Sequence, residues 1–204
     1  MFKLLPILCF GFSVIPAVAE PGFSLGRFFS FFDKGPPAYV SEAALPDGWP
    51  LPGPYDQVTA KSYPAYRAAF TPSNRPNSGF WTLFKHIKKN AIPMTSPVEM
   101  TMATNHQGGS MEMEQMAFLY LTQKVGSIGP DGENVVVRDV PACNALSYTW
   151  QGTRNDKSIA KARAAIDAAL KAENKSVSHY RILGYNSPFI SSSKQTHELQ
   201  AILK

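Results

Sequence analysis

The sequence predicts an α+β fold in which two similar halves form an eight-stranded, mainly antiparallel sheet with two main helices on one side. Sliding the chain against itself by 77 residues places residues 61–68 over residues 138–145, which indicates an internal repeat. Each copy is followed by a helical pattern and then by two strand-like segments. Two copies of strand, strand, helix, strand, strand give eight strands, in a sheet that is either open or curled into a distorted barrel.

The first helix is predicted over residues 79–90. Four apolar side chains recur there at i, i+3, i+4 and i+7, and therefore share one face: Phe80, Leu83, Phe84 and Ile87. Ser78 suits the N-cap, and three lysines at positions 85, 88 and 89 favour the C-terminal end, where backbone carbonyls carry partial negative charge. We expect the helix to end near Asn90.

The second helix is predicted over residues 156–173, a segment rich in Ala and Lys with one apolar stripe. Strand-like segments follow both helices. In the first half they are residues 98–103 and 111–122, and in the second half residues 179–185 and 198–203.

Two prolines shape the segment that leaves the first helix. Pro93 and Pro97 cannot donate a backbone hydrogen bond, and each favours extended geometry in the residue before it. The chain should therefore leave the helix as an irregular edge before the next strand.

The run from Ile92 to Val98, Ile-Pro-Met-Thr-Ser-Pro-Val, resembles the Met-Thr-Ala/Ser-Pro-Val signature of the SOUL heme-binding family, which also follows a helix containing Gly-Phe. Residues 55–70 are similar to the family's first strand pair, and residues 135–142 to its Val-Arg-x-Val-Pro-Ala segment. The resemblance covers roughly residues 54–204. It implies a distorted barrel of two pseudo-symmetric halves, related to bacterial effector-binding domains, with a ligand cleft between the halves.

Composition divides the chain of 204 residues into three parts. Residues 1–19 are expected to be a signal peptide, because Lys3 precedes an apolar run and Ala17-Val18-Ala19 fits a cleavage site. A membrane helix is the alternative, but the run is shorter than the about 20 residues that span a bilayer. Residues 20–53 form a leader rich in Pro, Gly and Phe, and residues 54–204 form the SOUL-like domain. These features predict a periplasmic or secreted protein.

The phenylalanines of the leader, Phe28, Phe29, Phe31 and Phe32, allow a contact with a membrane or a partner, but we favour a short element that packs back on the domain. Removal of Lys3 with the signal peptide leaves 19 basic side chains against 15 acidic ones, a net charge of +4. This excess helps to attract an anionic ligand, and the basic residues are too scattered to indicate nucleic-acid binding. Cys143 would be the one remaining cysteine, without an intramolecular disulfide, and we interpret it as a buried, inert thiol.

The exposed side of the first helix is the candidate ligand site. A tetrapyrrole needs a flat apolar wall and cations for its propionates; Trp81 offers the wall, and Lys85, Lys88 or Lys89 the cations. The alternative is an ordinary solvated basic face. The family resemblance implies a shallow groove between this helix and a loop near the C-terminus, here residues 185–190 with Phe189, and Lys194 just beyond.

Iron ligation has two candidates. One branch of the family has a histidine where this chain has Ser62, so that axial ligand is missing. His86, placed opposite the core stripe of the helix, and Met94 are the local substitutes, since imidazole and thioether both bind heme iron. Binding without an axial ligand, through apolar contacts and propionate salt bridges, is the other interpretation.

Two alternatives concern other chemistry. Six methionines at positions 94, 100, 102, 111, 113 and 116, with His106 between them, suit Cu(I), but the same alternation fits a strand that fills a core, which we favour. Glu99, Glu112 and Glu114 could serve a hydrolase, although no nucleophile, zinc or phosphate motif accompanies them. We therefore expect a non-catalytic protein that reversibly binds heme or a related tetrapyrrole as its ligand, as a carrier or buffer.

Overall fold

The computed structural model describes residues 37–72, 76–103 and 111–204, without the side chains of residues 76 and 77. Residues 36–204 form one compact unit. The expected signal peptide, the leader phenylalanines and the turn with His106 lie outside the described residues.

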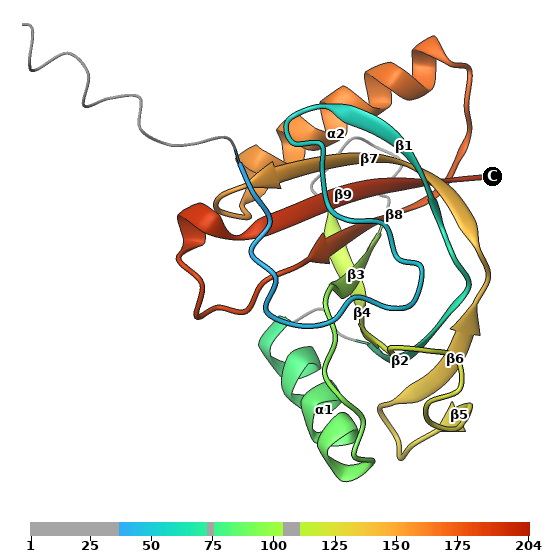
Figure 1. Ribbon diagram of the computed structural model, residues 1–204. Coiled ribbons are helices and arrows are strands. Elements are labelled where there is room, and N and C mark those ends of the chain that lie inside the picture. The colour runs from blue at the N-terminus through green and yellow to red at the C-terminus, as the bar shows by residue number, and fades with distance from the viewer. Residues whose placement is uncertain (1–36, 73–75, 104–110) are drawn as a thin grey trace, which may run out of the picture. The chain divides into compact units, whose positions relative to one another are not determined.

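The described residues of this unit form nine strands, two α-helices and one 3₁₀ helix; Figure 1 shows their arrangement. The first half of the chain contributes β1 (Val58–Tyr63), β2 (Tyr66–Pro72), α1 (Pro76–Lys89), β3 (Val98–Ala103), β4 (Glu112–Leu119) and β5 (Gly129–Pro130). The second half contributes β6 (Val136–Val140), β7 (Cys143–Gln151), α2 (Asp156–Ala172), β8 (Val177–Gly184), η2 (Ser192–Lys194) and β9 (Thr196–Leu203).

All nine strands belong to one sheet, in the order β1-β7-β9-β8-β3-β4-β2-β6-β5, and every neighbouring pair is antiparallel. The α+β prediction is confirmed. The ninth strand is the two-residue β5, which returns along the outer edge of β6. The sheet is not closed, since β1 and β5 stand at its two ends. Of the two forms that the sequence left open, the closed barrel is therefore wrong.

The internal repeat is visible in the strand order. The repeat relates β1 to β6, β2 to β7, β3 to β8, and β4 to β9. If β5 is left out, strands related in this way occupy equivalent positions on the two sides of the sheet centre, so the strand order is pseudo-symmetric. The two halves meet where β3 pairs with β8, with Met100 opposite Ile182. Paired strands of one continuous sheet thus join the two halves, whereas the family resemblance had led us to expect a cleft between them.

The first two strands of each half do not pair with each other. β1 pairs with β7 of the second half, and β6 pairs with β2 of the first half. The connections explain this exchange, because each has two residues, Pro64-Ala65 and Pro141-Ala142. A two-residue hairpin needs positive φ, which proline cannot adopt and alanine adopts only with strain. Residues 55–70 thus contain β1 and most of β2, two strands that do not pair with each other, and the chain crosses from one half of the sheet to the other between them.

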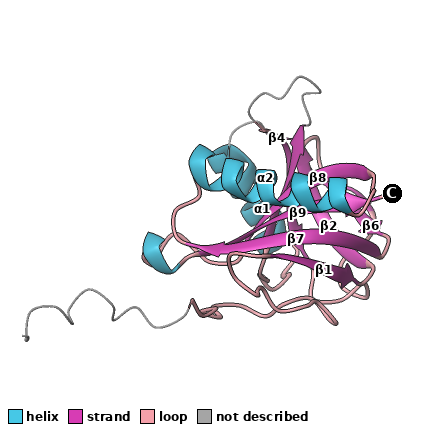
Figure 2. Cartoon of the chain, turned by 90° about the horizontal axis from the view of Figure 1, so that it is seen from above, coloured by secondary structure: helices cyan, strands magenta, loops and turns pink. Residues whose placement is uncertain are grey.

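The two helices cover one face of the sheet (Figure 2). Leu83 and Ile87 of α1 and Ile166 of α2 lie in the same core with apolar side chains of the strands. The other face, which we call the second face, carries a smaller core that includes Trp49, with Tyr39 and Leu45 packed against it. The folded unit thus includes residues of the expected leader.

Both helices end in the same way. Ala91 and Asn174 follow the last turns with φ of 52° and 51°, the left-handed conformation of a Schellman cap. The bonds match: Ile92 N donates to Ile87 O after α1, and Lys175 N donates to Leu170 O after α2. Asn155 caps the start of α2 through a reciprocal capping box. Helix α1 begins at Pro76, so the prediction of Ser78 as its N-cap is wrong.

Within the part of the chain that the structure describes, neither α-helix is long and apolar enough to cross a membrane.

Candidate functional site

The exposed side of α1 carries an aromatic surface. The Trp81 side chain is 57% exposed, and its ring centroid lies 5.6 Å from that of Phe84. The Lys88 ammonium lies 5.5 Å from the Phe84 ring, within the range of a cation–π contact. We call Trp81, Phe84 and Lys88 the aromatic flank. Phe84, which the sequence assigned to the core stripe, is half-buried: it packs against the core and also contacts Trp81 and Lys88.

A pocket of about 270 Å³ adjoins this flank. Its lining comes from α1 and from the segment around β5: Thr82, Lys85, His86, Lys89, Asp131, Glu133, Asn134 and Val135. The Lys89 ammonium donates to Asp131 at 2.7 Å. Hydrogen bonds from Lys89, then from His86 and Asn90, hold the pKa of the Asp131 carboxyl well below its usual value of 3.8. Of the predicted lysines, Lys85 and Lys89 line the pocket, and Lys88 lies on the aromatic flank.

His86 is buried, with 6% of its surface exposed, although sequence placed it opposite the core stripe. Its Nδ1 lies 2.5 Å from Asp131 Oδ2, and its Nε2 lies 2.7 Å from the Tyr120 hydroxyl. A helical wheel could not reveal this burial, because the residues that cover His86 lie 34 and 45 positions further along the chain. An axial bond to iron would require one of these hydrogen bonds to break.

Asp131, His86 and Tyr120 follow the spatial order of a catalytic triad, with the tyrosine in the place of the nucleophile. The Tyr120 side chain is 1% exposed, and burial together with Asp131 raises its pKa to about 12. A buried phenol that holds its proton is a poor nucleophile. The group is better interpreted as a lock that ties the segment around Asp131 to α1.

The remaining predicted residues lie apart from the pocket lining. Met94 is 40% exposed on the segment after α1, and Phe189 is 94% exposed on the loop between β8 and β9. Lys194 ends the short helix η2 of the same loop. The Glu42 carboxylate holds the start of this loop by accepting bonds from the backbone N and hydroxyl of Ser187 at 2.8 and 2.7 Å.

The Met-Thr-Ser-Pro-Val segment acts as a structural junction. The Thr95 hydroxyl donates to the carbonyl of Leu119 at the end of β4. Ser96 makes two bonds, from its backbone N to Ala44 O at 2.9 Å and from its hydroxyl to Tyr185 O at 2.7 Å. The segment thus joins the leader, β4 and the loop after β8.

Of the six methionines of the copper alternative, four lie in β3 and β4, at positions 100, 102, 113 and 116, and Met111 immediately precedes β4. Met100, Met102 and Met116 are buried in the core under the helices. The Arg154 guanidinium lies 2.8 Å from the Met100 sulfur, and a cation at this sulfur disfavours a bound Cu(I). Among the described residues, no group of three or more His, Cys, Asp or Glu side chains is placed to hold a metal ion.

The three glutamates of the hydrolase alternative lie on β3 and β4. Glu112 and Glu114 are exposed, as the alternating pattern indicated, whereas Glu99 is 3% exposed on the second face. The Glu99 carboxylate already accepts hydrogen bonds from Arg181 and Tyr66.

Sequence reasoning missed a set of buried charges on the second face: Lys61, Glu99, Arg181 and Glu198. Arg181 Nη1 donates to Glu99 at 2.9 Å, and Lys61 Nζ donates to Glu198 at 3.0 Å. The signal was charge inside strand-like runs such as Tyr-Arg-Ile-Leu and His-Glu-Leu-Gln. Cys143 lies beside this set, half-buried and free, and burial raises the pKa of its thiol, which agrees with an inert role.

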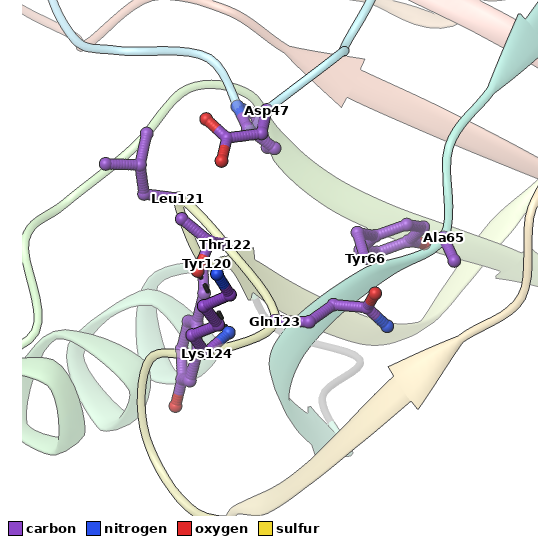
Figure 3. Close-up of a pocket in the computed structure, with 9 residues that line it drawn as sticks. Asp47, Ala65, Tyr66, Tyr120, Leu121, Thr122, Gln123 and Lys124 are labelled. Atoms are coloured by element: carbon purple, nitrogen blue, oxygen red, sulfur yellow. Dashed lines mark hydrogen bonds between the residues drawn. The ribbon is translucent and has the colours of Figure 1, made fainter.

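A second pocket, of about 200 Å³, lies near the same face (Figure 3). Pro46 and Asp47 line it together with Tyr66 and residues 120–124. The Tyr66 hydroxyl points inward and donates to Glu99 at 2.7 Å. The pocket therefore contacts Tyr66, whose hydroxyl group in turn contacts the buried charges.

Comparison with solved structures supports the fold. The chain is similar to an uncharacterized conserved protein from Listeria innocua, with 10% identity, 74% of this chain and 94% of that chain covered, and a TM-score of 0.57. It is also similar to the C-terminal domain of EcmrR, with 13% identity, 72% and 97% coverage and a TM-score of 0.54. A hydrolase from Listeria innocua gives 9% identity, 74% and 94% coverage and a TM-score of 0.51.

In the complex of EcmrR with DNA, the match covers 57% of that chain, at 13% identity and a TM-score of 0.55. At these identities the likeness concerns the fold alone. No curated protein matches the chain. The family profile described as SOUL heme-binding protein matches residues 54–201, which is well over half of the chain. The chain therefore belongs to the SOUL heme-binding protein family.

Proposed function

We propose that this protein reversibly binds heme or a related tetrapyrrole on α1, and that it carries or buffers this ligand without transforming it. Membership of the SOUL family supports the ligand class. The observation that carries the proposal is the aromatic flank, where the Trp81 ring is 57% exposed beside Phe84 and Lys88. An exposed indole beside a cation suits a flat apolar ring with acidic side groups.

The neighbouring pocket suits one edge of the ligand. Its volume of about 270 Å³ lies at the lower limit of small-molecule sites, so it would take a propionate rather than the whole macrocycle. Lys85 and Lys89 would bind this carboxylate. The macrocycle would then lie over Trp81, and Phe189 and Lys194 would add contacts if the loop after β8 approaches α1.

Binding without an axial bond from His86 is part of the proposal, because both ring nitrogens already have hydrogen-bond partners. Met94 is the remaining candidate for an axial ligand, with its side chain 40% exposed. A ligand held by its face and edge exchanges readily, which fits a carrier or buffer. We also propose that the protein works in the periplasm or outside the cell, on the basis of residues 1–19.

Titration with hemin, followed by absorbance, tests the proposal. A saturable Soret shift at one hemin per chain is expected, and a spectrum that remains that of free hemin throughout would rule out binding. Protoporphyrin IX, which lacks iron, should bind with similar affinity. His86→Gln should leave the heme spectrum unchanged, and a changed spectrum would assign His86 to the iron. Met94→Leu tests the remaining candidate: a changed spectrum would assign Met94 to the iron, and an unchanged one would show binding without an axial ligand from either residue.

A further inference from the structure

The turn formed by residues 46–49, which we call the Trp49 turn, places an indole in the second face of the sheet. The Trp49 side chain is 6% exposed. Its ring centroid lies 4.8 Å from that of Tyr63 and 5.2 Å from that of Tyr66, and the Arg181 guanidinium lies 5.5 Å from the ring. The indole is thus surrounded by two aromatic rings and a planar cation, a set of groups that would enclose any flat aromatic molecule of this size.

The wall behind the indole is polar. The Glu198 carboxylate accepts bonds from Lys61, and from the hydroxyls of Tyr63 and Tyr185 at 2.5 and 3.1 Å. The Glu99 carboxylate accepts bonds from Arg181 and Tyr66. Burial of such ion pairs is often no more stabilising than apolar packing would be. A recess with aromatic sides and several fixed polar groups is typical of ligand sites.

The group that fills this recess comes from outside the sheet. The Trp49 turn contains neither helix nor strand, and Trp49 N donates to Pro46 O within it. Gly48, at φ 73°, allows the tight bend. One backbone bond, from Asp47 N to Leu121 O at 2.9 Å, links the turn to the residues after β4. The pocket of about 200 Å³ is lined by Asp47 and Leu121, the two residues that this bond joins, and by Tyr66 (Figure 3). A turn that moved away from the sheet would therefore have open space on this side.

We propose that the recess under Trp49 is a second binding site, separate from α1, for a neutral planar aromatic molecule that displaces the Trp49 turn. The charge of the wall determines the class of ligand. Lys61 and Arg181 balance Glu99 and Glu198, so a charged ligand would bring an unpaired charge into a buried site, and a neutral one would not.

One polar atom on the ring would improve the fit. The Trp49 Nε1 faces the Tyr185 hydroxyl but has no partner at full hydrogen-bond geometry among the described residues. A free ligand can rotate within the recess until its own N–H donates a hydrogen bond, whereas the backbone holds the Trp49 indole in a position where its N–H does not. The proposal does not depend on the tetrapyrrole site.

Calorimetric titration with indole tests the site. Indole is neutral, and it has the same ring system as the Trp49 side chain that the ligand must displace. Trp49→Ala should bind indole at least about tenfold more tightly than the unchanged protein, in which the tethered ring competes. Trp150→Ala is the matched control, because Trp150 is also 6% exposed but lies in the core under the helices. Equal binding by the two variants would overturn the proposal, because any new cavity would then suffice.

Two further measurements keep the proposal testable if Trp49→Ala does not fold. Asp47→Pro removes the N–H that binds Leu121 O, and proline suits the second position of this type of turn. It should bind indole about fivefold more tightly than the unchanged protein, the effect of one lost hydrogen bond; unchanged affinity would exclude displacement of the turn. Tryptamine and indole-3-acetate, which carry opposite charges, should bind more weakly than indole, and tighter binding of either would overturn the assignment of a neutral ligand.

Discussion

Arg181 and Glu99 form an ion pair inside the second face of the sheet, with Arg181 Nη1 at 2.9 Å from Glu99 Oε2 and both side chains almost fully buried. The pair joins β8 to β3, the two strands at which the halves meet. It therefore connects the repeat units through side chains as well as through the backbone.

Removal of one partner should be costly. Arg181→Met leaves Glu99 charged without its cation, so we expect a loss of about 3–5 kcal/mol in the free energy of unfolding, measured with urea. The double variant Arg181→Met/Glu99→Met should be more stable than Arg181→Met alone, because no unpaired charge remains. A double variant that loses the sum of both single effects would show that the two residues act independently.

Trp81 should dominate the contact with a tetrapyrrole. Trp81→Ala is expected to raise the dissociation constant for hemin at least about fivefold, because an aromatic contact contributes about 1 kcal/mol beyond its buried area. Leu51→Ala is the control, since Leu51 is 68% exposed but lies outside α1. Absorbance titration measures the dissociation constant for hemin of both variants. An equal increase in the two variants would argue against a site on α1.

Acid should destabilise the fold through His197. Burial, and then the charge of Arg154, lower the pKa of His197 from 6.5 to about 4 in the folded protein. The unfolded chain binds this proton more strongly than the folded protein does. The contribution of neutral His197 to the free energy of unfolding is therefore fully present above pH 6.5 and is lost as the pH falls towards 4. The total loss is about 3 kcal/mol.

The variant His197→Leu tests this dependence, because leucine cannot be protonated. Between pH 6.5 and 4, its free energy of unfolding should fall by less than that of the unchanged protein. Parallel curves in urea titrations across this range would contradict the assignment to His197.

Ala91 should be a site of backbone strain. It has φ of 52° in the cap of α1, where an L-residue costs about 1–2 kcal/mol and glycine costs only its extra chain entropy. Ala91→Gly should therefore stabilise the protein by about 0.5–1 kcal/mol in urea unfolding. Asn174→Gly, at the matching cap of α2, should have a smaller effect, because asparagine tolerates this conformation. A larger gain at Asn174 would refute the argument.

Several elements could be predicted because their signals are local. The apolar spacing of Leu83 and Ile87 predicted the buried face of α1, and both residues are in the core. The alternation in β4 correctly predicted that Glu112 and Glu114 face solvent. The same alternation could not predict that Glu99 is buried, because that depends on the Trp49 turn and on strands from the other half of the sheet.

The candidate site was predictable to a similar degree. The exposure of Trp81 and Lys88 follows from their position on the helix. The burial of His86 does not, because it depends on Tyr120 and Asp131, which reach α1 only when the sheet has formed.

By itself, the sequence determined the repeat, the two helices and the family signature, because each depends on residue types at short, regular spacing. Only the tertiary structure decided the exchange of β1 and β6 between the halves, the open sheet and the buried charges. Arg181 and Glu99 are 82 positions apart in the chain, and residue spacing carries no record of a contact at that separation. Folding removes both charges from water, and their attraction to each other offsets this cost, so neither charge can be buried well without the other.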